Sequence, residues 1–296
     1  MLATIRDFFQ QRGVLEIETP LLCQHTVTDR HIDSFRVENY FLQTSPEYAM
    51  KRLLAQGSGP IFQICKAFRQ GEAGKKHNPE FSLLEWYRPG FDHHNLMDET
   101  DELLQLLLQT KPAKRISYRN LFLETLNIDP FSITSESLKN IITNKVSNLH
   151  FDIHQLNKDD CLNLLLSYFI EPSLGFDAPV FVYDYPSTQA ALAKLRRDED
   201  ITVAERVEVY IQGVELANGF HELGDAKEQR ERFLEEQQYR RERGLFVPEI
   251  DERLLDALRN GFPDCAGIAV GLDRLAMLIA KVDDVGGVLS FSWDQA

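Results

Sequence analysis

The chain of 296 residues is poor in cysteine and has no long apolar run. Its four cysteines, Cys23, Cys65, Cys161 and Cys265, are scattered and never form a CxxC pair, so the sequence indicates neither a zinc site nor a disulfide framework. No apolar run reaches the roughly 18 residues of a membrane-spanning helix. Residues 1–12 have helical spacing rather than the apolar core of a signal peptide. We therefore expect a cytoplasmic protein with no membrane partner.

Positive charge is also scarce. The sequence carries 46 acidic and 32 basic residues, a formal net charge of −14. A broad nucleic-acid-binding face draws its affinity from lysines and arginines that neutralise phosphates, so such a face is not expected, although a local basic cleft is compatible with this composition. The hydrophobic content of 43% and charged content of 26% are ordinary for a globular protein.

Phosphate-binding motifs built from glycine are absent too. Neither GxxxxGK[ST] nor GxGxxG occurs, so any phosphate binding relies on arginines. Two segments, 68–81 and 267–275, each set an arginine where apolar, strand-like sequence meets a break. Arg69 precedes a polar loop that contains glycines, and Arg274 lies at the start of an apolar helix. Together they are suited to hold the two ends of a triphosphate, which predicts ATP chemistry.

The hydrophobic periodicity predicts a mixture of helices and strands. Helices are expected over 4–12, 48–55, 95–109, 227–244, 252–260 and 272–280, and strands over 14–20, 61–68, 81–86, 180–186 and the two halves of 205–218. Strands joined by hairpins, with helices between and outside them, imply an α+β fold with a mainly antiparallel sheet. We expect one catalytic domain over residues 1–296, with 111–176 as a peripheral helical insertion.

Two acidic residues lie near a predicted hairpin turn at Gln212-Gly213. Counting by twos from this turn places Glu208 and Glu215 on the same face, in a diagonal relation with a separation of roughly 7 Å. Magnesium is typically held by one or two carboxylates together with substrate phosphates, so this pair is a candidate metal site. The alternative is a pair of ordinary solvated strand carboxylates.

Three further features have both a structural and a binding interpretation. Segment 218–223 either supplies an amide, a flexible glycine and an acid to a ligand or is a turn with a helix-cap acid. Segment 44–48 is a helix start with Ser45 as N-cap and Pro46 in the first turn, a binding edge, or both. Phe81 is either a core residue or a face for adenine, since stacking of a base on an aromatic ring contributes roughly 1–3 kcal/mol.

Together these segments resemble the three signature motifs of class II aminoacyl-tRNA synthetases. Residues 13–20 resemble motif 1, residues 68–81 resemble motif 2 with its arginine and its His-x-x-x-Phe, and residues 267–275 resemble motif 3, Gly-x-Gly-x-Asp-Arg. Within this class the sequence is similar to the lysyl branch. That similarity is carried by Ser-Pro-Glu at 45–47, His-Asn-Pro-Glu-Phe at 77–81 and Glu-Leu-Ala-Asn-Gly-Phe-His-Glu at 215–222.

One difference separates the chain from lysyl-tRNA synthetases, which carry an N-terminal OB-fold that reads the anticodon. Here the sequence starts directly at the motif 1 helix, so we expect no OB-fold and no tRNA partner. With Leu-Glu-Trp-Tyr-Arg-Pro at 84–89 and Gly-Ile-Ala-Val-Gly at 267–271, the chain resembles the elongation factor P lysine ligase family. That family attaches (R)-β-lysine to a lysine of elongation factor P. The resemblance implies a ligase that uses ATP and Mg²⁺, forms an aminoacyl-adenylate and is a homodimer through motif 1.

The resemblance also implies roles for individual residues. Arg69 would hold the α-phosphate, Arg274 the γ-phosphate and one face of adenine, Phe81 the other face, and His77 the outer phosphates. The catalytic residues are then Arg69 and Arg274, within an ATP-binding set of Arg69, Gln70, Gly71, Glu72, His77, Asn78, Phe81, Glu215, Leu216, Gly271 and Arg274. Glu208 and Glu215 would bind Mg²⁺. The amino-acid substrate would be surrounded by Ser45, Pro46, Glu47, Tyr87, Asn218, Glu222 and Ala269.

The sequence departs from the synthetase pattern at two places. The usual Arg-x-Glu of motif 2 is here Arg69-Gln70-Gly71, and Glu72 comes one position late. Ala269 stands where lysyl-tRNA synthetases have glycine, as it does in the ligase family. Its methyl group is expected to disfavour α-lysine against the β-amino isomer.

Two other functions compete with the ligase. A lysyl-tRNA synthetase-like enzyme that charges tRNA is disfavoured by the acidic composition and the absent anticodon domain. A non-catalytic regulatory paralogue is disfavoured because Arg69, Arg274, Glu208 and Glu215 are all present. An ATP-dependent amide synthetase such as ammonia-using asparagine synthetase is a more distant possibility.

Overall fold

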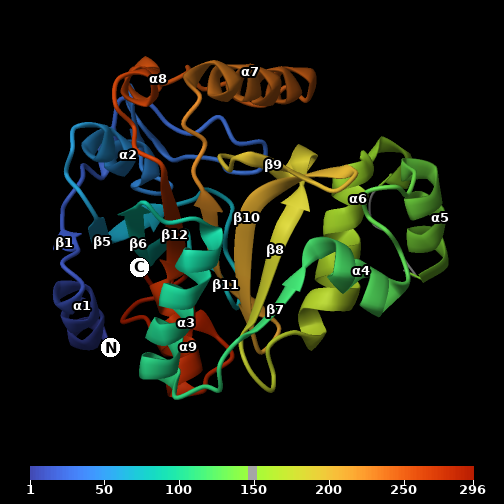
Figure 1. Ribbon diagram of the computed structural model, residues 1–296, viewed down its shortest axis with the longest axis horizontal. Helices are drawn as coiled ribbons and strands as arrows, with labels where there is room; N and C mark the ends of the chain where they lie inside the picture. Colours follow the sequence, from blue (N-terminus) through green and yellow to red (C-terminus); the bar gives the residue numbers. More distant parts are fainter. Residues whose placement is uncertain (146–151) are drawn as a thin grey trace. The chain divides into compact units, whose positions relative to one another are not determined.

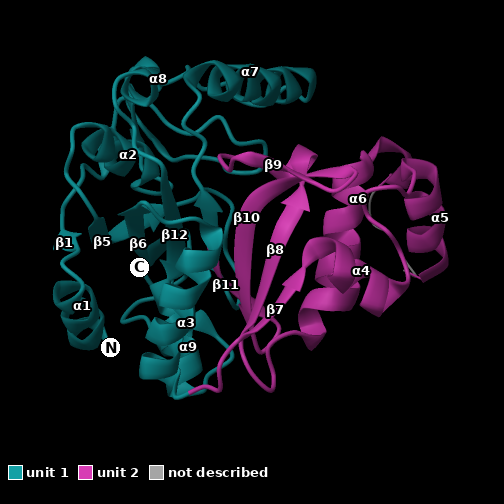
Figure 2. Ribbon diagram, viewed as in Figure 1, with its two compact units in different colours: residues 1–109, 219–296 teal, residues 110–218 magenta. Residues whose placement is uncertain are grey.

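The computed structural model describes residues 1–145 and 152–296. It divides into two compact units, shown in different colours in Figure 2. Unit 1 comprises residues 1–109 and 219–296, and unit 2 comprises residues 110–218. The predicted helical insertion at 111–176 belongs to unit 2, and its residues 146–151 lie outside the described part of the chain.

The sheet of unit 1 is built on a long hairpin. Its strands are β1 (Leu15–Glu16), β5 (Ile61–Phe68), β6 (Glu80–Pro89) and β12 (Cys265–Gly271). β6 pairs antiparallel with β5 on one side and with β12 on the other, while β1 pairs parallel with β5. A separate three-stranded sheet contains β2 (Leu22–Cys23), β3 (Arg36–Val37) and β4 (Tyr40–Leu42).

The helices of unit 1 cover this hairpin and fix its surroundings. They are α1 (Leu2–Gln11), α2 (Glu47–Ala55), α3 (His93–Leu108), α7 (Ala226–Glu242), α8 (Glu252–Arg259), α9 (Leu272–Ala280) and the 3₁₀ turn η5 (Val285–Gly287). α3 and α9 lie against β12, and α9 also lies against β6 (Figure 1). Beneath them, Phe9 stacks on Phe62 with ring centroids 4.6 Å apart and meets Trp86 at 5.2 Å. All three rings are buried, and each contributes roughly 1.5–3 kcal/mol by leaving water.

Unit 2 has its own strands and helices. The strands are β7 (Lys114–Ser117), β8 (Val180–Pro186), β9 (Leu195–Asp198) and β10 (Ile201–Ile211), and β8 pairs parallel with β7 and antiparallel with β10. The helices are α4 (Tyr118–Leu126), α5 (Ser135–Lys145) and α6 (Lys158–Leu165), with short turns η1 (Ile153–Gln155), η2 (Leu166–Ile170), η3 (Glu171–Ser173) and η4 (Ser187–Gln189). β11 (Val214–His221) begins in unit 2 and ends in unit 1.

The predicted α+β class with mainly antiparallel pairing is confirmed. The hairpin turn at Gln212-Gly213 is also confirmed, and both residues adopt the positive φ that a tight two-residue turn requires. Within the described residues, 1–145 and 152–296, no helix combines the length and the apolar character needed to cross a membrane.

Three local predictions were wrong. The strand expected over 14–20 is regular only at Leu15–Glu16, where it pairs with β5. The segment expected as a loop after Asn218 continues β11 as far as His221. Gly219 there is not a flexible loop residue, because a Cβ would lie 2.7 Å from Ile268 Cβ, so glycine permits the close approach of β11 to β12. The N-cap of α2 is Pro46 rather than Ser45.

Candidate functional site

The polar loop between β5 and β6 has a defined backbone structure. Arg69 closes the base of the loop, where its backbone N–H donates to the carbonyl of Pro79 at 2.9 Å. Near the tip, Gly74 and His77 exchange two backbone hydrogen bonds at 3.0 and 3.1 Å. Gln70 donates its backbone N–H to the carbonyl of Asp33 at 2.7 Å. The loop is therefore held at its base, flank and tip, and the side chains of Lys75, Lys76 and His77 near its tip are exposed.

Arg69 is surrounded by groups that fix its guanidinium. Its Nε lies 3.4 Å from the carbonyl of Thr44, and its guanidinium carbon lies 5.1 Å from the centroid of the Phe81 ring. The late acid of motif 2, Glu72, forms an ion pair with Arg69 at 3.7 Å. Phe81 is half-buried and serves as a platform for the arginine, so it is not a plain core residue.

Arg274 is the third residue of α9 and reaches across to the tip of the same loop. Its Nη2 lies 2.6 Å from Nε2 of His77, and its Nε donates to the carbonyl of Lys76 at 3.3 Å. Burial, followed by the positive charge of Arg274, lowers the pKa of His77. A neutral imidazole accepts the hydrogen bond from the guanidinium. The two predicted phosphate-binding segments therefore meet, as their sequence suggested.

Further contacts fix the position of α9 and of the loop. Asp273 accepts a hydrogen bond from the backbone N–H of Ser82 at 2.8 Å, which ties the first turn of α9 to β6. Gly271, the last residue of β12, is the N-cap of α9. Asn78 is buried, donates to the carbonyl of Glu80 at 2.7 Å and accepts from the backbone N–H of Trp293 at 3.0 Å. Gly71, the glycine after Gln70, has φ of 84°, which suits the sharp turn there.

A second cluster of charged side chains lies at the start of α2 and is buried. The Nζ of Lys51 lies 2.7 Å from Oε1 of Glu47 and 2.6 Å from Oε2 of Glu222. Lys51 is 2% exposed and Glu222 is 1% exposed, so this ion pair is removed from solvent. The other oxygen of Glu222, Oε1, is buried and has no hydrogen-bond partner among the described residues. Such an oxygen is a strong acceptor for an incoming cation.

A third carboxylate, Glu85 of β6, belongs to the same cluster. It accepts hydrogen bonds from Ser45 Oγ and from the Tyr87 hydroxyl, both at 2.7 Å. Ser45 also accepts from the backbone N–H of Glu47 at 3.1 Å, so it still serves the first turn of α2 although Pro46 is the cap. Burial, reinforced by Glu47, raises the pKa of Glu85 to about 7.

The two remaining acid–base groups of the cluster are shifted by their surroundings. Burial raises the pKa of Glu222 to about 8, with Lys51 acting in the opposite direction and Glu47 adding to the rise. Burial acts to lower the pKa of Lys51, but the carboxylates of Glu222 and Glu47 outweigh it and raise that pKa. Lys51 is therefore a permanent cation, whereas the raised pKa values of Glu85 and Glu222 lie near neutral pH.

The strand register places Ala269 in this cluster. Ala269 of β12 is directly opposite Glu85 of β6, and Gly267 is directly opposite Tyr87. Directly opposed residues of an antiparallel pair share one face of the sheet. A Cβ on Gly267 would lie 2.3 Å from the Tyr87 ring and 2.9 Å from Oε1 of Glu222, so glycine is required for the ring to pack there. The half-buried methyl group of Ala269 borders the carboxylates on this face.

A comparison with protein families matches residues 1–295 to the tRNA synthetases class II (D, K and N). The chain belongs to this class II synthetase family. Within it, the chain is 48% identical to an elongation factor P–(R)-β-lysine ligase of Photobacterium profundum, 47% to that of Pectobacterium atrosepticum and 47% to that of Salmonella typhi. Each match spans 100% of this chain and 94% of the relative. The resemblance inferred from the motifs is thereby confirmed.

Four of the predicted site residues lie in unit 2: Glu208, Glu215, Leu216 and Asn218. Glu208 is not a solvated strand acid. It is 6% exposed, and its oxygens accept from Tyr185, Tyr210 and Arg206. Asn218 accepts from Arg206 Nε at 3.1 Å, Glu215 is half-buried, and Leu216 is buried.

The donor chemistry of this pair fits a hard cation, which prefers carboxylate oxygens. A carboxylate offers about four acceptor positions, and three hydrogen bonds occupy three of those on Glu208. Oε2 accepts from both tyrosines, whereas Oε1 accepts from Arg206 and is the oxygen on which a position remains within unit 2. Oε1 of Glu208 therefore offers an acceptor position that suits a magnesium ion.

Sequence reasoning missed Lys51 and Glu85. Lys51 follows Glu47 by four residues on a predicted helix, a spacing that brings side chains together. Glu85 precedes Tyr87 by two residues on a predicted strand, which places both on one face. Both signals were therefore present, but lysine and glutamate at these spacings are usually solvated, and only the burial in the fold distinguishes them.

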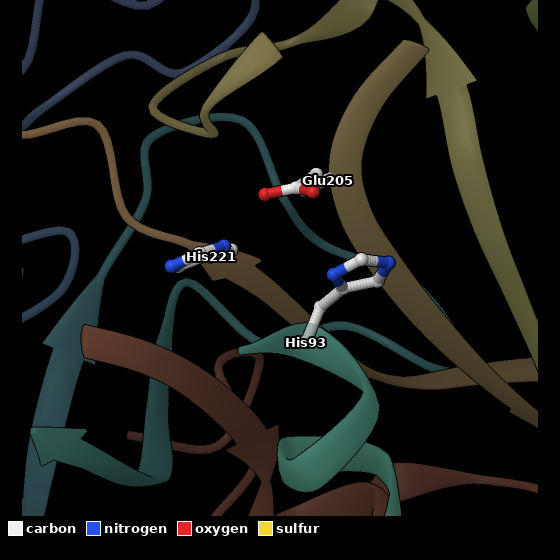
Figure 3. A group of neighbouring side chains, drawn as sticks. All are labelled: His93, Glu205 and His221. Carbon is white, nitrogen blue, oxygen red and sulfur yellow. The ribbon is translucent and has the colours of Figure 1, made fainter. Parts of the chain in front are cut away.

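Three other titratable side chains are labelled in Figure 3. His93 begins α3 and His221 ends β11, both within unit 1, while Glu205 lies in β10 of unit 2. His221 is engaged within its own unit, because its Nε2 lies 2.9 Å from Oδ1 of Asp264. None of the three was predicted as a site residue, and we assign them no metal role.

Proposed function

We propose that this chain is a ligase that activates (R)-β-lysine with ATP and transfers it to a lysine of elongation factor P. One observation supports this most directly. Unit 1 holds a partly solvated arginine and histidine site, suited to phosphates, together with a largely buried cluster of Glu47, Glu85 and Glu222, suited to ammonium groups. A diamino acid carries two such groups, and the similar relatives are named for this substrate and partner.

In the first step the substrate carboxylate attacks the α-phosphorus of ATP. A bond forms between a carboxylate oxygen and phosphorus, the bond to the bridging oxygen breaks, and pyrophosphate leaves. Arg69 contacts the α-phosphate and Arg274 the γ-phosphate, where they stabilise the charge that spreads over the phosphoryl oxygens. Phe81 and Arg274 hold adenine between them, and His77 contacts the outer phosphates. Gln70, Gly71, Glu72, Asn78, Leu216 and Gly271 complete the ATP set.

In the second step the ε-amine of the acceptor lysine attacks the carbonyl carbon of the mixed anhydride. An amide bond forms, AMP leaves, and the amine loses a proton. The adenylate is already activated, so correct positioning of the amine is the main requirement. Glu208 and Glu215 would hold Mg²⁺, which neutralises phosphate charge when it is bound.

The amino groups of the substrate are proposed to lie among Glu47, Glu222, Tyr87 and Asn218, with Ser45 and Pro46 at the edge. The methyl group of Ala269 takes up part of the proposed substrate space beside Glu85, the residue opposite it in the strand register. An α-amine and a β-amine differ by one carbon in position, and a single carbon shifts discrimination by roughly 1–3 kcal/mol. This methyl group is therefore proposed to select the β isomer.

A direct assay tests the function. ATP consumption is measured with (R)-β-lysine, α-lysine and aspartate, each with elongation factor P, with tRNA or with no acceptor. We expect AMP formation with β-lysine and covalent labelling of elongation factor P alone. Labelling of tRNA instead would favour a tRNA-charging enzyme, and no nucleotide turnover with any amino acid would favour a regulatory paralogue.

We also propose that the protein is a cytoplasmic homodimer, with motif 1 at the interface. Leu15 of β1 is 57% exposed, and β1 is an edge strand of the unit 1 sheet. Exposed apolar side chains next to an edge strand are suited to pair with a second copy. Sedimentation at micromolar concentration should give a dimer, and substitution of Leu15 by lysine should give a monomer. A monomeric wild-type protein would contradict this proposal.

A further inference from the structure

Lys51 is the feature of the buried cluster that the proposed chemistry does not use. Its ammonium lies between Glu47 and Glu222, donates to Oε1 of Glu47 at 2.7 Å and forms an ion pair with Oε2 of Glu222 at 2.6 Å. Oε1 of Glu222, the oxygen that Lys51 does not contact, is buried and has no hydrogen-bond partner among the described residues. Lys51 therefore occupies one side of the Glu222 carboxylate and leaves the other side available.

The titratable groups of the cluster come from several elements. α2 supplies Glu47 and Lys51, β6 supplies Glu85 and Tyr87, and Glu222 follows β11. β5 supplies Cys65, where burial, reinforced by Glu85, raises the pKa of the thiol to about 12, so the thiol is neutral. When the three carboxylates and the ammonium of Lys51 are all ionised, two negative charges are left uncompensated. The two ammonium groups of a diamino acid would neutralise them.

An apolar group adjoins the cluster and shares Tyr87 with it. Met50, Leu54, Ile61, Tyr87 and Cys265 form one buried group, and α2 contributes Met50 and Leu54 on either side of Lys51 in the sequence. Charges next to such an apolar group are poorly screened by solvent. Three carboxylates without a cation would not stay ionised there, because like charges raise the pKa values of one another.

We propose that Lys51 is a positioning residue that orients Glu47 and Glu222, and favours the ionised form of Glu222, for the ammonium groups of the amino-acid substrate. This inference rests on the proposed function, in which those carboxylates bind a diamino acid. Lys51 contacts the carboxylates rather than the reacting atoms. Loss of Lys51 should therefore lower the affinity for the amino acid and leave the affinity for ATP unchanged.

The proposal has a pH signature. Glu85 and Glu222 have pKa values raised to about 7 and about 8, so both are partly protonated at neutral pH. Only the ionised forms attract an ammonium group, and affinity for the substrate should therefore rise with pH from about 6 to 8. Lys51 lowers the pKa of both carboxylates. Removing it shifts both titrations, and the rise in affinity, to higher pH.

The experiment compares Lys51→Met, Lys51→Arg and Lys227→Met. Lys227 lies on another helix, and its side chain is 87% exposed, so its loss is a matched control. Adenylation is measured by pyrophosphate exchange, with separate KM values for β-lysine and ATP across the pH range. Lys51→Met should raise the KM for β-lysine by roughly 100-fold or more, since a buried carboxylate pair loses its cation, and change the KM for ATP little. The control should match wild type.

A second measurement does not depend on activity. Carboxyl ¹³C NMR of the free protein should show Glu222 titrating at higher pH in Lys51→Met than in wild type. If Lys51→Met does not fold, Lys51→Arg tests the proposal instead. Arginine keeps the positive charge, but its larger planar guanidinium cannot take the position of the ammonium between the two carboxylates. The KM of Lys51→Arg for β-lysine should rise by roughly tenfold while its pH profile stays close to that of wild type.

Two results would overturn the inference. One is a Lys51 variant whose KM for β-lysine and pH profile equal those of wild type, and the other is a Glu222 titration that Lys51→Met leaves unchanged. These differ from failure of the proposed function, which appears as a wild-type protein that does not activate β-lysine at all. In that case the NMR titration still tests whether Lys51 controls the ionisation of Glu222.

Discussion

The two charged regions of unit 1 are built on opposite principles. The phosphate region consists of Arg69, Arg274 and His77, whose side chains lie at the surface of a hairpin loop and at the start of a helix. The amine region consists of Lys51, the fully buried carboxylates of Glu85 and Glu222, and the half-buried carboxylate of Glu47. A guanidinium group is charged at every physiological pH, so an arginine site needs no counter-ion to stay cationic. Buried carboxylates keep their charge only when a cation is supplied, first by Lys51 and then, we propose, by the substrate.

This contrast predicts different consequences of substitution. In the phosphate region, removal of a charge should affect catalysis and leave stability almost unchanged, because the side chain is partly solvated. In the amine region, removal of a charge should affect the KM of one substrate, the pH profile and stability together. The following experiments test this difference, from the largest expected effect to the smallest.

Arg274→Ala should abolish adenylate formation, with a loss of roughly 100- to 1000-fold or more in pyrophosphate exchange, because a preorganised charge on the γ-phosphate is removed. The thermal midpoint should change little, since the side chain is partly solvated and contacts His77 and the carbonyl of Lys76 at the surface of the loop. Arg259→Ala, which removes a surface arginine paired with Asp256, is the control. Exchange at nearly the wild-type rate in Arg274→Ala would refute the assignment.

Phe81→Ala should raise the KM for ATP by roughly 5- to 150-fold, which corresponds to the roughly 1–3 kcal/mol of a base stacked on a ring. Part of the effect comes from Arg69, whose guanidinium lies over this ring. Phe81→Trp keeps an aromatic face and should retain most of the affinity for ATP. The KM for β-lysine should stay the same in both variants. If Phe81→Ala changes only the KM for β-lysine, the ring belongs to the amine region instead.

Ala269→Gly should raise the specificity constant for α-lysine relative to that for β-lysine by an amount that corresponds to roughly 1–3 kcal/mol. The methyl group removed is opposite Glu85 in the strand register. Ala266→Gly is a matched control on the same strand, because its side chain points to the other face. Adenylation kinetics on both isomers give the ratio. If Ala269→Gly leaves the ratio of the two specificity constants unchanged, Ala269 only packs in the sheet and does not select the substrate.

Glu72→Gln should have the smallest effect. The ion pair of Glu72 with Arg69 is partly exposed, and such pairs contribute less than about 1 kcal/mol. Removing the acid leaves Arg69 more available to the α-phosphate, so the KM for ATP should fall by at most about fivefold. Isothermal titration with a non-hydrolysable ATP analogue gives the affinity directly. A large loss of affinity would show that Glu72 contacts the nucleotide itself.

The phosphate region could be predicted from sequence because its signals are local. Arginine before a loop with glycines, and arginine at the start of an apolar helix, follow from the positions where strands and helices end. The structure confirms those positions: β5 ends at Phe68, and α9 begins at Leu272. The role of Glu72, the late acid of motif 2, was harder to predict, because only the folded loop shows that Glu72 pairs with Arg69.

The amine region could be predicted only in part. Glu47, Tyr87 and Glu222 were identified through the family resemblance, but Lys51 and Glu85 were missed, since a charged residue is normally expected in solvent. The segment with Glu222 was also expected as a loop, and it is the end of β11. A strand pattern is hard to recognise where two strands approach so closely that glycine replaces a side chain, as Gly219 does.

By itself, the sequence determined the α+β class, the hairpins, the absence of glycine-based phosphate motifs and the family to which the chain belongs. These features depend on periodicity, turn residues and short motifs, which act over a few neighbouring residues. The tertiary structure alone decided which charges are buried and which partners they have. Burial and the pKa values that follow from it depend on contacts between residues as distant as Lys51 and Glu222, because the energy of a charge depends on everything that surrounds it.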